Sequence, residues 1–262
     1  MRTIQITSDI AIGPDAPLAL IAGPCVLESE EHLLAIGGQA KTIAGQAGFP
    51  FLLKCSFDKA NRSSQTAFRG PGLDAGLAAL ARVKNELGVP LVTDVHDISQ
   101  VALVTKVADV IQIPAFLCRQ TDLLCAAGRT GKPVLVKKGQ FMAPADMRGA
   151  IAKIAACGNP NVLLAERGAS FGYHNLVVDM RALVIMRSLG VPVVFDATHS
   201  VQLPGGLGDA TGGERGFIPQ LARAAAAVGM DALFLEVHDQ PDQAPCDGPN
   251  MLPLSDLPAL LQ

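Results

Sequence analysis

Two segments of this chain, Gly88-Val89-Pro90-Leu91-Val92-Thr93-Asp94 and Gly190-Val191-Pro192-Val193-Val194-Phe195-Asp196, share one pattern. In each segment, glycine and proline, which commonly follow the end of a helix, precede a short apolar run that ends at an aspartate. Gly131-Lys132-Pro133 introduces a third run of this kind. The pattern predicts a helix that stops, a buried strand, and a polar side chain at the point where the strand ends.

Apolar runs of this kind recur along the whole chain, separated by longer Ala/Leu-rich stretches of helical character. The runs are 18–22, 51–53, 91–93, 110–113, 134–136, 162–165, 193–195 and 233–235, and the helical stretches include 73–87, 146–156, 179–189 and 220–228. Runs that are apolar throughout are typical of parallel strands buried on both faces. A doubly wound open sheet is the alternative, but it usually has fewer strands.

The fold that follows is α/β, a single-domain (β/α)8 TIM barrel over residues 1–262. The length of 262 residues agrees with the ~250 residues typical of this fold. No linker or low-complexity tract divides the chain. The pattern of residues 1–12 also permits a short N-terminal β-hairpin that closes the bottom of the barrel.

The composition excludes several classes of protein. Hydrophobic residues make up 49% of the chain and the net charge is −3, which argues against a nucleic-acid or anionic-membrane partner. No apolar run approaches the ~20 residues of a membrane span, and residues 1–12 lack the apolar core of a signal peptide. The six cysteines form no Cys-x-x-Cys pair, which fits reduced thiols. We therefore expect a cytoplasmic protein that acts on small molecules.

Polar residues at the strand ends indicate where the chemistry lies, because barrel active sites are built at the carboxyl ends of the strands. In chain order these residues are Cys25, Lys54, Asp94, His96, Gln112, Lys137, Lys138, Glu166, Arg167, Asp196, His199, Glu236 and His238. Helix caps and turns explain single residues such as Asp94. They do not explain three separate cationic sites and three metal-competent sites, so we expect a substrate with more than one anionic group.

A basic loop strengthens this expectation. Residues 54–64 hold three cations and several hydroxyls and lead to Arg69-Gly70-Pro71-Gly72, a composition that suits oxyanions. A solvated basic loop is the alternative. A nucleotide is not expected, because the chain has no Walker A motif and no G-x-G-x-x-G that opens a helix. Gly205-Gly206-Leu207-Gly208 and Gly212-Gly213 predict a mobile loop over the mouth.

Four potential metal ligands follow the first, seventh and eighth strands, which are neighbours in a closed barrel. They are Cys25, His199, Glu236 and Asp247. One thiolate, one imidazole and two carboxylates suit Zn²⁺, Fe²⁺ or Mn²⁺ better than Mg²⁺. Alternatives remain open at this point: Cys25 as a packing residue, His199 as a hydrogen-bonding or acid–base group, and His238 or Cys246 as ligands. The other cysteines are interpreted as packing residues: Cys55, Cys118, Cys125 and Cys157.

Ten longer motifs lie between about residue 18 and the C-terminus. They are 21–25 (IAGPC), 57–64 (FDKANRSS), 69–73 (RGPGL), 93–96 (TDVH), 112–117 (QIPAFL), 119–123 (RQTDL), 136–138 (VKK), 167–173 (RGASFGY), 195–199 (FDATH) and 246–249 (CDGP). Together they resemble the 3-deoxy-D-manno-octulosonate 8-phosphate synthase family, also named 2-dehydro-3-deoxyphosphooctonate aldolase.

The resemblance implies a carbon–carbon bond-forming transferase of lipopolysaccharide core biosynthesis. Its substrates are phosphoenolpyruvate, D-arabinose 5-phosphate and water, and its products are 3-deoxy-D-manno-octulosonate 8-phosphate and phosphate. It also implies a homotetramer in which loop 60–63 contributes to a neighbour's site. The implied phosphoenolpyruvate ligands are Lys54, Lys59, Gln112, Lys137 and Arg167, and the implied sugar-phosphate ligands are Asn61, Arg62 and Ser63. The implied catalytic residues are Lys59, Asp94, His96, Lys137, His199 and Asp247.

The family has a metal-dependent and a metal-independent subclass, and the position of Cys25 is asparagine in the independent one. Cys25 therefore points to a metal-dependent enzyme, with His199, Glu236 and Asp247 as the other ligands. The stretch 246–249 is similar to metal-independent members, so the pattern is mixed.

Two alternatives to this activity remain: a related enzyme that shares the barrel, and a protein of a different class. 3-Deoxy-D-arabino-heptulosonate 7-phosphate synthase uses erythrose 4-phosphate, and its family carries a Lys-Pro-Arg-Thr-type loop where this chain has Lys59-Ala60-Asn61-Arg62-Ser63. The other alternative is a catalytically silent barrel that serves as a scaffold or sugar-phosphate sensor. Against the silent barrel, every position matched to the family keeps a chemically competent residue.

Overall fold

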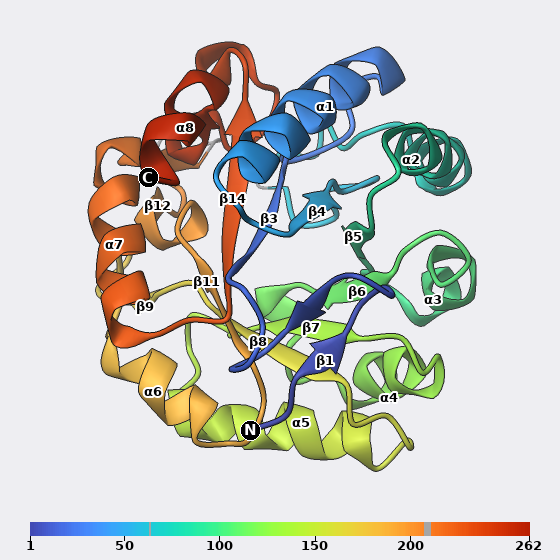
Figure 1. The fold of residues 1–262 in the computed structure, drawn as a ribbon, viewed down its shortest axis with the longest axis vertical. Helices are drawn as coiled ribbons and strands as arrows, with labels where there is room; N and C mark the ends of the chain where they lie inside the picture. Colours follow the sequence, from blue (N-terminus) through green and yellow to red (C-terminus); the bar gives the residue numbers. More distant parts are fainter. Residues whose placement is uncertain (63, 207–210) are drawn as a thin grey trace.

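The computed structural model describes residues 1–62, 64–206 and 211–262 (Figure 1). Eight parallel strands form its centre: β3 (Ala19–Gly23), β4 (Phe51–Lys54), β5 (Leu91–Asp94), β6 (Val110–Ile113), β7 (Val134–Lys137), β8 (Val162–Glu166), β11 (Val193–Asp196) and β14 (Ala232–His238). Each strand pairs with the next in chain order, and β14 pairs with both β11 and β3. The barrel is therefore closed. The predicted (β/α)8 fold is confirmed, and each predicted apolar run overlaps one barrel strand.

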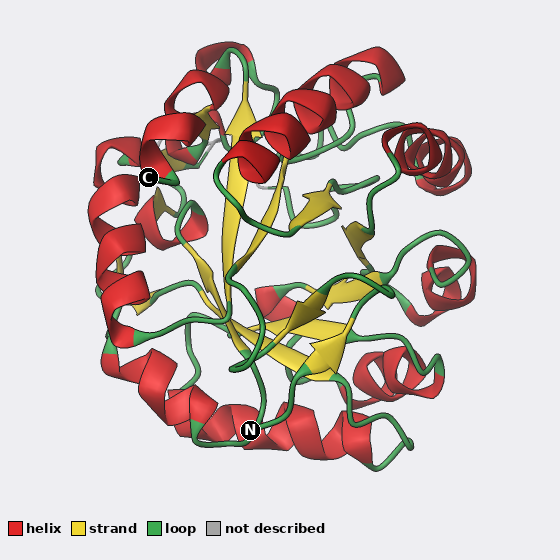
Figure 2. Cartoon of the chain, in the orientation of Figure 1, coloured by secondary structure: helices red, strands yellow, loops and turns green. Residues whose placement is uncertain are grey.

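Helices surround the barrel on its outside (Figure 2). They are α1 (Glu30–Gln46), α2 (Leu73–Leu87), α3 (Ile98–Val104), α4 (Thr121–Arg129), α5 (Arg148–Ala155), α6 (Arg181–Arg187), α7 (Ile218–Val228) and α8 (Leu257–Leu260). Helix α2 has the predicted bounds and ends at Gly88, whose φ of 61° lies in the left-handed region that favours glycine. The predicted helix 146–156 divides into a 3₁₀ turn, η2 (Pro144–Met147), and α5. None of the described helices has both the length and the apolar character needed to cross a membrane.

Shorter elements occupy the loops. The small strands are β9 (Ala169–Ser170), β10 (Leu176–Val177), β12 (Gln202–Leu203), β13 (Gly212–Gly213) and β15 (Leu252–Pro253). The 3₁₀ turns are η1 (Ala115–Leu117), η3 (His199–Val201), η4 (Arg215–Phe217), η5 (Pro241–Gln243), η6 (Gly248–Asn250) and η7 (Leu254–Asp256). Most of them follow the carboxyl end of a barrel strand, where they shape the loops around the pocket.

An N-terminal hairpin lies across one end of the barrel (Figure 1). Its strands, β1 (Ile4–Gln5) and β2 (Ala11–Ile12), pair antiparallel. Ile4 and Ile12 are buried and pack in one cluster with the apolar side chains of the barrel interior. The hairpin permitted by the sequence is therefore present, and it seals the amino-terminal end.

The barrel interior has an apolar layer and, above it, a polar layer. The apolar layer includes Ile21, Leu52, Val92, Val110, Leu135, Leu163, Val194 and Phe234. Side chains on a strand alternate between its two faces, so the residue two positions later points the same way. On six strands that residue is polar and at most 5% exposed: Lys54, Asp94, Gln112, Lys137, Asp196 and Glu236. The alternation thus places a layer of polar side chains at the carboxyl end of the barrel.

Candidate active site

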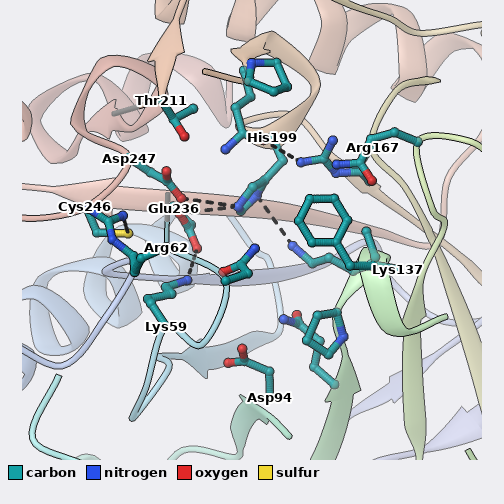
Figure 3. A pocket seen from close by; sticks show the side chains of 18 of the residues that line it. Lys59, Arg62, Asp94, Lys137, Arg167, His199, Thr211, Glu236, Cys246 and Asp247 are labelled. Carbon is teal, nitrogen blue, oxygen red and sulfur yellow. Dashed lines mark hydrogen bonds and ion pairs between the residues drawn. The ribbon is translucent and has the colours of Figure 1, made fainter. Parts of the chain in front are cut away.

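The polar layer forms the floor of a pocket at the carboxyl ends of the strands (Figure 3). The pocket is lined by Lys54, Lys59, Asn61, Arg62, Asp94, His96, Gln112, Pro114, Ala115, Phe116, Lys137, Gln140, Arg167, His199, Gln202, Pro204, Gly205, Thr211, Glu236, Cys246 and Asp247. Twelve of the fourteen residues predicted for the site are in this lining. Cys25 lies behind it, and Ser63 is outside the described residues.

Glu236 is the centre of the anionic side of the pocket. Its Oε1 atom lies 2.8 Å from Lys54 Nζ and 3.5 Å from Lys59 Nζ. Burial alone would raise the pKa of Glu236, but Lys54 and Lys59 bring it well below its usual range. The carboxylate is therefore ionised, and its Oε2 atom is buried without a hydrogen-bond partner among the described residues. That free oxygen is available to a ligand.

Asp196 links the lysine of β7 to the histidine after β11. It forms an ion pair with Lys137 and lies 2.8 Å from His199 Nδ1. Burial opposes its charge, but His199 and Lys137 lower the pKa of Asp196 below the usual range. The contact of Asp196 with Nδ1 fixes the His199 ring so that Nε2 lies on the cavity side, 3.7 Å from Glu236 Oε2. The sequence shows Asp196 only as a strand-end residue, because its partner Lys137 lies on another strand, 59 positions away.

Arg167, the first residue after β8, supplies a cation to the pocket. Glu166, the last residue of β8, does not face the pocket. The Nη2 atom of Arg167 donates to Gln202 Oε1 at 2.7 Å, and its Nη1 atom is buried without a partner among the described residues. Glu166 and Lys138 lie 3.5 Å apart and are each 1% exposed. Both hydrogen-bond the backbone of Gly168. This pair holds the turn that follows Arg167.

The expectation that Lys138 and Glu166 face the mouth is therefore wrong. Neighbouring residues on a strand point to opposite faces, so Lys137 faces the pocket and Lys138 turns away. In β8, Leu163 and Ala165 belong to the interior cluster, which places Glu166 on the outer face. The cations that line the pocket come from β4, β7 and the loops after β4 and β8.

Asp94 and His96 form a second polar group at the end of β5. His96 Nε2 lies 2.9 Å from Asp94 Oδ2, and Ser56 Oγ donates to Asp94 Oδ1. Burial would raise the pKa of Asp94, but His96 and Lys59 bring it far below its usual range. The Nδ1 atom of His96 is buried and has no partner among the described residues. It is a free hydrogen-bonding group in the pocket.

Arg62 brings the basic loop against the loop that follows β14. Its Nη1 atom lies 3.0 Å from Cys246 Sγ, and its Nη2 atom donates to Pro245 O at 3.2 Å. The Nε atom is buried without a partner among the described residues. Asn61 lines the same part of the pocket.

Two groups of potential metal ligands meet at Asp247. His199, Glu236 and Asp247 offer ligand atoms within 4.8 Å of one another, and so do Cys25, Cys246 and Asp247. Asp247 Oδ2 lies 3.8 Å from His199 Nε2 and 3.4 Å from Cys25 Sγ. Asp247, which precedes η6, has a φ of 52°, the only positive φ at a described non-glycine residue, so the backbone is strained at the residue that presents this carboxylate. Thiol, imidazole and carboxylates together fit a borderline divalent metal.

His238 belongs to a different cluster and does not line the pocket. Its Nε2 atom lies 2.9 Å from Glu28 Oε1, and His32 completes this group. The backbone N–H of Gln240 donates to His238 Nδ1, so the proton of a neutral ring is on Nε2 and points to Glu28. His238 is therefore not a ligand at the mouth, whereas Cys246 is close to it.

The remaining cysteines lie away from the pocket, and all six are free. Cys55 and Cys118 are part of the apolar core, as a packing role predicts. Cys125 and Cys157 are only half-buried. In the glycine-rich loop, Gly205 and Thr211 line the pocket, while 207–210 lie outside the described residues. Its mobility stays a prediction.

Comparison with known proteins identifies similar chains. The model of the DAHP synthetase I family matches residues 2–262. The chain is 59% identical over 253 residues to a 2-dehydro-3-deoxyphosphooctonate aldolase of Trichlorobacter lovleyi, covering 97% of this chain and 93% of the relative. Proteins with the same name from Syntrophotalea carbinolica and Citrifermentans bemidjiense are each 58% identical. The first match covers 97% of this chain and 92% of the relative, and the second covers 99% and 96%.

The depressed pKa of Asp94 predicts how stability depends on pH. Asp94→Asn removes the buried carboxylate that lies 2.9 Å from His96 Nε2 and accepts a hydrogen bond from Ser56 Oγ, so we expect a loss of about 3 kcal/mol in unfolding free energy near pH 7. A lowered folded-state pKa adds stability above the unfolded-state value of ~4, and this stability is lost as the pH falls further. The difference between wild type and variant should therefore shrink below about pH 4. Urea unfolding of metal-free protein between about pH 3 and 7 measures it.

Asp9→Asn is the control, because Asp9 is exposed and its replacement should change the unfolding free energy by less than about 0.5 kcal/mol. A difference between wild type and Asp94→Asn that stays constant with pH would show that Asp94 is not held as a charged group.

Proposed function

The chain belongs to the DAHP synthetase I family, and from this premise we propose that it carries out the reaction of its 2-dehydro-3-deoxyphosphooctonate aldolase relatives. It condenses phosphoenolpyruvate with D-arabinose 5-phosphate and water to give 3-deoxy-D-manno-octulosonate 8-phosphate and phosphate. The identity of 58–59% over nearly the whole chain supports this reaction. The alternative with erythrose 4-phosphate is not favoured.

The observation that carries the proposal is the position of cations on two sides of one pocket. Figure 3 shows Lys137 and Arg167 on one side and Lys59 and Arg62 on the other. Two phosphorylated substrates need two such places, because each brings at least one group with a charge near −2 at neutral pH. A scaffold without catalytic function would not need to bury charges at a cost of several kcal/mol per ion.

We assign the phosphoenolpyruvate subsite to Lys54, Lys137, Arg167 and Gln112, with Lys59 at its edge. Arg167 Nη1 and Gln112 Oε1 are buried and have no partner among the described residues. Arg167 offers a planar pair of donors to a carboxylate or phosphate. The ammonium of Lys137 lies over the Phe234 ring, 3.6 Å from its centroid, which supports the cation against burial.

The sugar phosphate is assigned to Arg62, Asn61 and Ser63 on the basic loop. Arg62 keeps a buried Nε atom without a partner among the described residues, and its other donors now contact Cys246 and a backbone carbonyl. A phosphate is a stronger acceptor than either contact. Arg62 therefore selects a substrate that ends in a phosphate at this end of the pocket.

In the proposed mechanism, the methylene carbon of phosphoenolpyruvate attacks the sugar aldehyde and forms the new carbon–carbon bond. Water adds to the second carbon, and phosphate leaves by cleavage of the C–O bond. Lys137 and Arg167 stabilise the charge on the departing phosphate. His96, with its free Nδ1 atom and its Nε2 atom next to Asp94, gives or takes a proton near the aldehyde oxygen.

A divalent metal, either zinc, iron or manganese, is proposed at Cys25, His199, Glu236 and Asp247. The donor types and the free Oε2 atom of Glu236 support this assignment. When bound, such an ion acts as a Lewis acid that orients an aldehyde or lowers the pKa of a water molecule. Asp196 holds His199 in the orientation that presents Nε2 to the site.

A homotetramer is proposed as the working form, in the cytoplasm. Five aromatic side chains on loops of the carboxyl-terminal side of the barrel are more than half exposed: Phe116, Phe141, Phe171, Tyr173 and Phe217. Exposed aromatic side chains are enriched at protein interfaces. The contribution of loop 60–63 to a neighbour's site stays a prediction, because Asn61 and Arg62 line the pocket of their own chain.

The reaction predicts a specific substrate dependence. Phosphate release from phosphoenolpyruvate should require a sugar phosphate, and arabinose 5-phosphate should give a kcat/KM at least about tenfold higher than erythrose 4-phosphate. Arg62→Ala should lower kcat/KM for arabinose 5-phosphate by more than about tenfold, because a charged hydrogen-bond donor to phosphate is lost. A coupled phosphate assay measures both effects.

The matched control is Arg82→Ala, which removes a surface arginine of α2 that pairs with Glu30 and should leave kcat/KM unchanged. Phosphate release without any sugar phosphate, or equal use of the two sugars, contradicts the proposed reaction.

Metal dependence predicts a different set of results. Wild-type protein should hold about one divalent ion per chain, and chelation should reduce kcat at least about tenfold, with recovery on adding Zn²⁺, Fe²⁺ or Mn²⁺. Cys25→Asn should weaken metal binding by about 10–100-fold and make the remaining activity insensitive to chelator. Elemental analysis of the purified proteins reports binding independently of activity. Cys125→Ser on α4 serves as the control and should bind metal as wild type does, and full activity of chelated wild type would refute the metal role.

A further inference from the structure

Cys25 and Cys246 bring two sulfur atoms into direct contact. Their Sγ atoms lie 2.9 Å apart, although the residues are 221 positions apart in the chain. A disulfide bond is about 2.0 Å long, so a shift of less than about 1 Å joins them.

The two cysteines differ in their access to the pocket. Cys246 lines the pocket, whereas Cys25 is 0% exposed and lies behind it. The guanidinium of Arg62 is 3.0 Å from Cys246 Sγ. A small oxidant that enters the pocket therefore meets Cys246 first.

We propose that Cys25 and Cys246 form a reversible disulfide, a modification site that responds to hydroperoxides. The sulfur of Cys246 attacks hydrogen peroxide, the O–O bond breaks, and a sulfenic acid and one water form. The sulfur of Cys25 then displaces the hydroxyl group from Cys246, and a second water leaves. Two thiols lose two protons and two electrons, and the peroxide is reduced to two waters. A dithiol reductant reverses the linkage by exchange.

The linkage has a direct consequence for metal binding. A sulfur in a disulfide is no longer the thiolate that a divalent metal needs, so the oxidised protein loses the ligand Cys25. This consequence rests on the metal site proposed above, whereas the linkage itself does not. Conversely, a metal bound to Cys25 occupies the sulfur that must close the bond, so metal protects the pair from oxidation.

Cys125 and Cys157 are the competing pair of thiols. Cys125 is on α4, Cys157 follows α5, and both are half-buried. The test therefore uses the full chain with Cys125→Ser and Cys157→Ser, which keeps four of the six cysteines. The other two, Cys55 and Cys118, are buried in the apolar core.

The experiment treats this metal-free protein with a small excess of hydrogen peroxide and counts thiols after unfolding. We expect two of the four thiols to disappear, a peptide that joins Cys25 to Cys246 and is lighter by two hydrogens, and full recovery with dithiothreitol. Adding Cys246→Ser should abolish the linked peptide. Zinc loaded before the peroxide should slow the loss of thiols at least about tenfold.

Four remaining thiols, a bond between other cysteines, or Cys246 oxidised to sulfinic acid beside a free Cys25 would overturn the linkage. Zinc content of the same samples tests its consequence: a cross-linked protein that still binds one zinc per chain shows that Cys25 is not the ligand. Phosphate release by the reduced protein tests the proposed reaction separately. Failure of the linkage, of Cys25 as a metal ligand and of the proposed reaction can therefore be told apart.

Discussion

The alternation of side chains between the two faces of each barrel strand is the constraint on which the site depends. In a closed parallel barrel every second side chain points inward, and here the apolar inward layer is followed by polar residues on six strands. A buried charge costs several kcal/mol unless a partner compensates it. The structure meets this requirement with the pairs Lys54–Glu236, Lys137–Asp196 and Asp94–His96. Each charge is thus fixed by the fold, and the donors and acceptors left over point to the pocket.

The architecture can be predicted from the sequence alone, because the sequence signals for strands and helices are local. Glycine-proline stops, apolar runs and one well-bounded helix, 73–87, could be read without knowing any long-range contact. The sequence does not show which way the strand-end side chains point. Run 162–165, for example, is apolar at every position, so it does not reveal which of its residues face the barrel interior. The strand-end pattern therefore predicts Lys138 and Glu166 at the mouth of the barrel, and this prediction is wrong. The Asp196–Lys137 pair and the contact between Cys25 and Cys246 are not evident from the sequence either, since the partners lie 59 and 221 positions apart in the chain.

The proposed metal ligands and the cysteine pair lie next to one another in the pocket. Asp247 contacts both the cysteine pair and His199, and Arg62 connects this part of the pocket to the proposed sugar-phosphate subsite through Cys246. With the metal and sugar-phosphate sites proposed above, a change at either sulfur would reach a metal ligand and a substrate ligand at once. On these proposals, Cys246 would add redox sensitivity to a site that Cys25 makes suitable for metal.

The central claim is that the buried cations of the polar layer hold phosphoenolpyruvate over the barrel floor. A crystal structure of the protein with phosphoenolpyruvate bound tests this claim most directly. The account predicts that the carboxylate and phosphate of the ligand lie within hydrogen-bond distance, about 2.7–3.2 Å, of Lys137 and Arg167, with Arg62 left free for the second substrate. Phosphoenolpyruvate bound at Arg62 instead, or outside the barrel mouth, would contradict it.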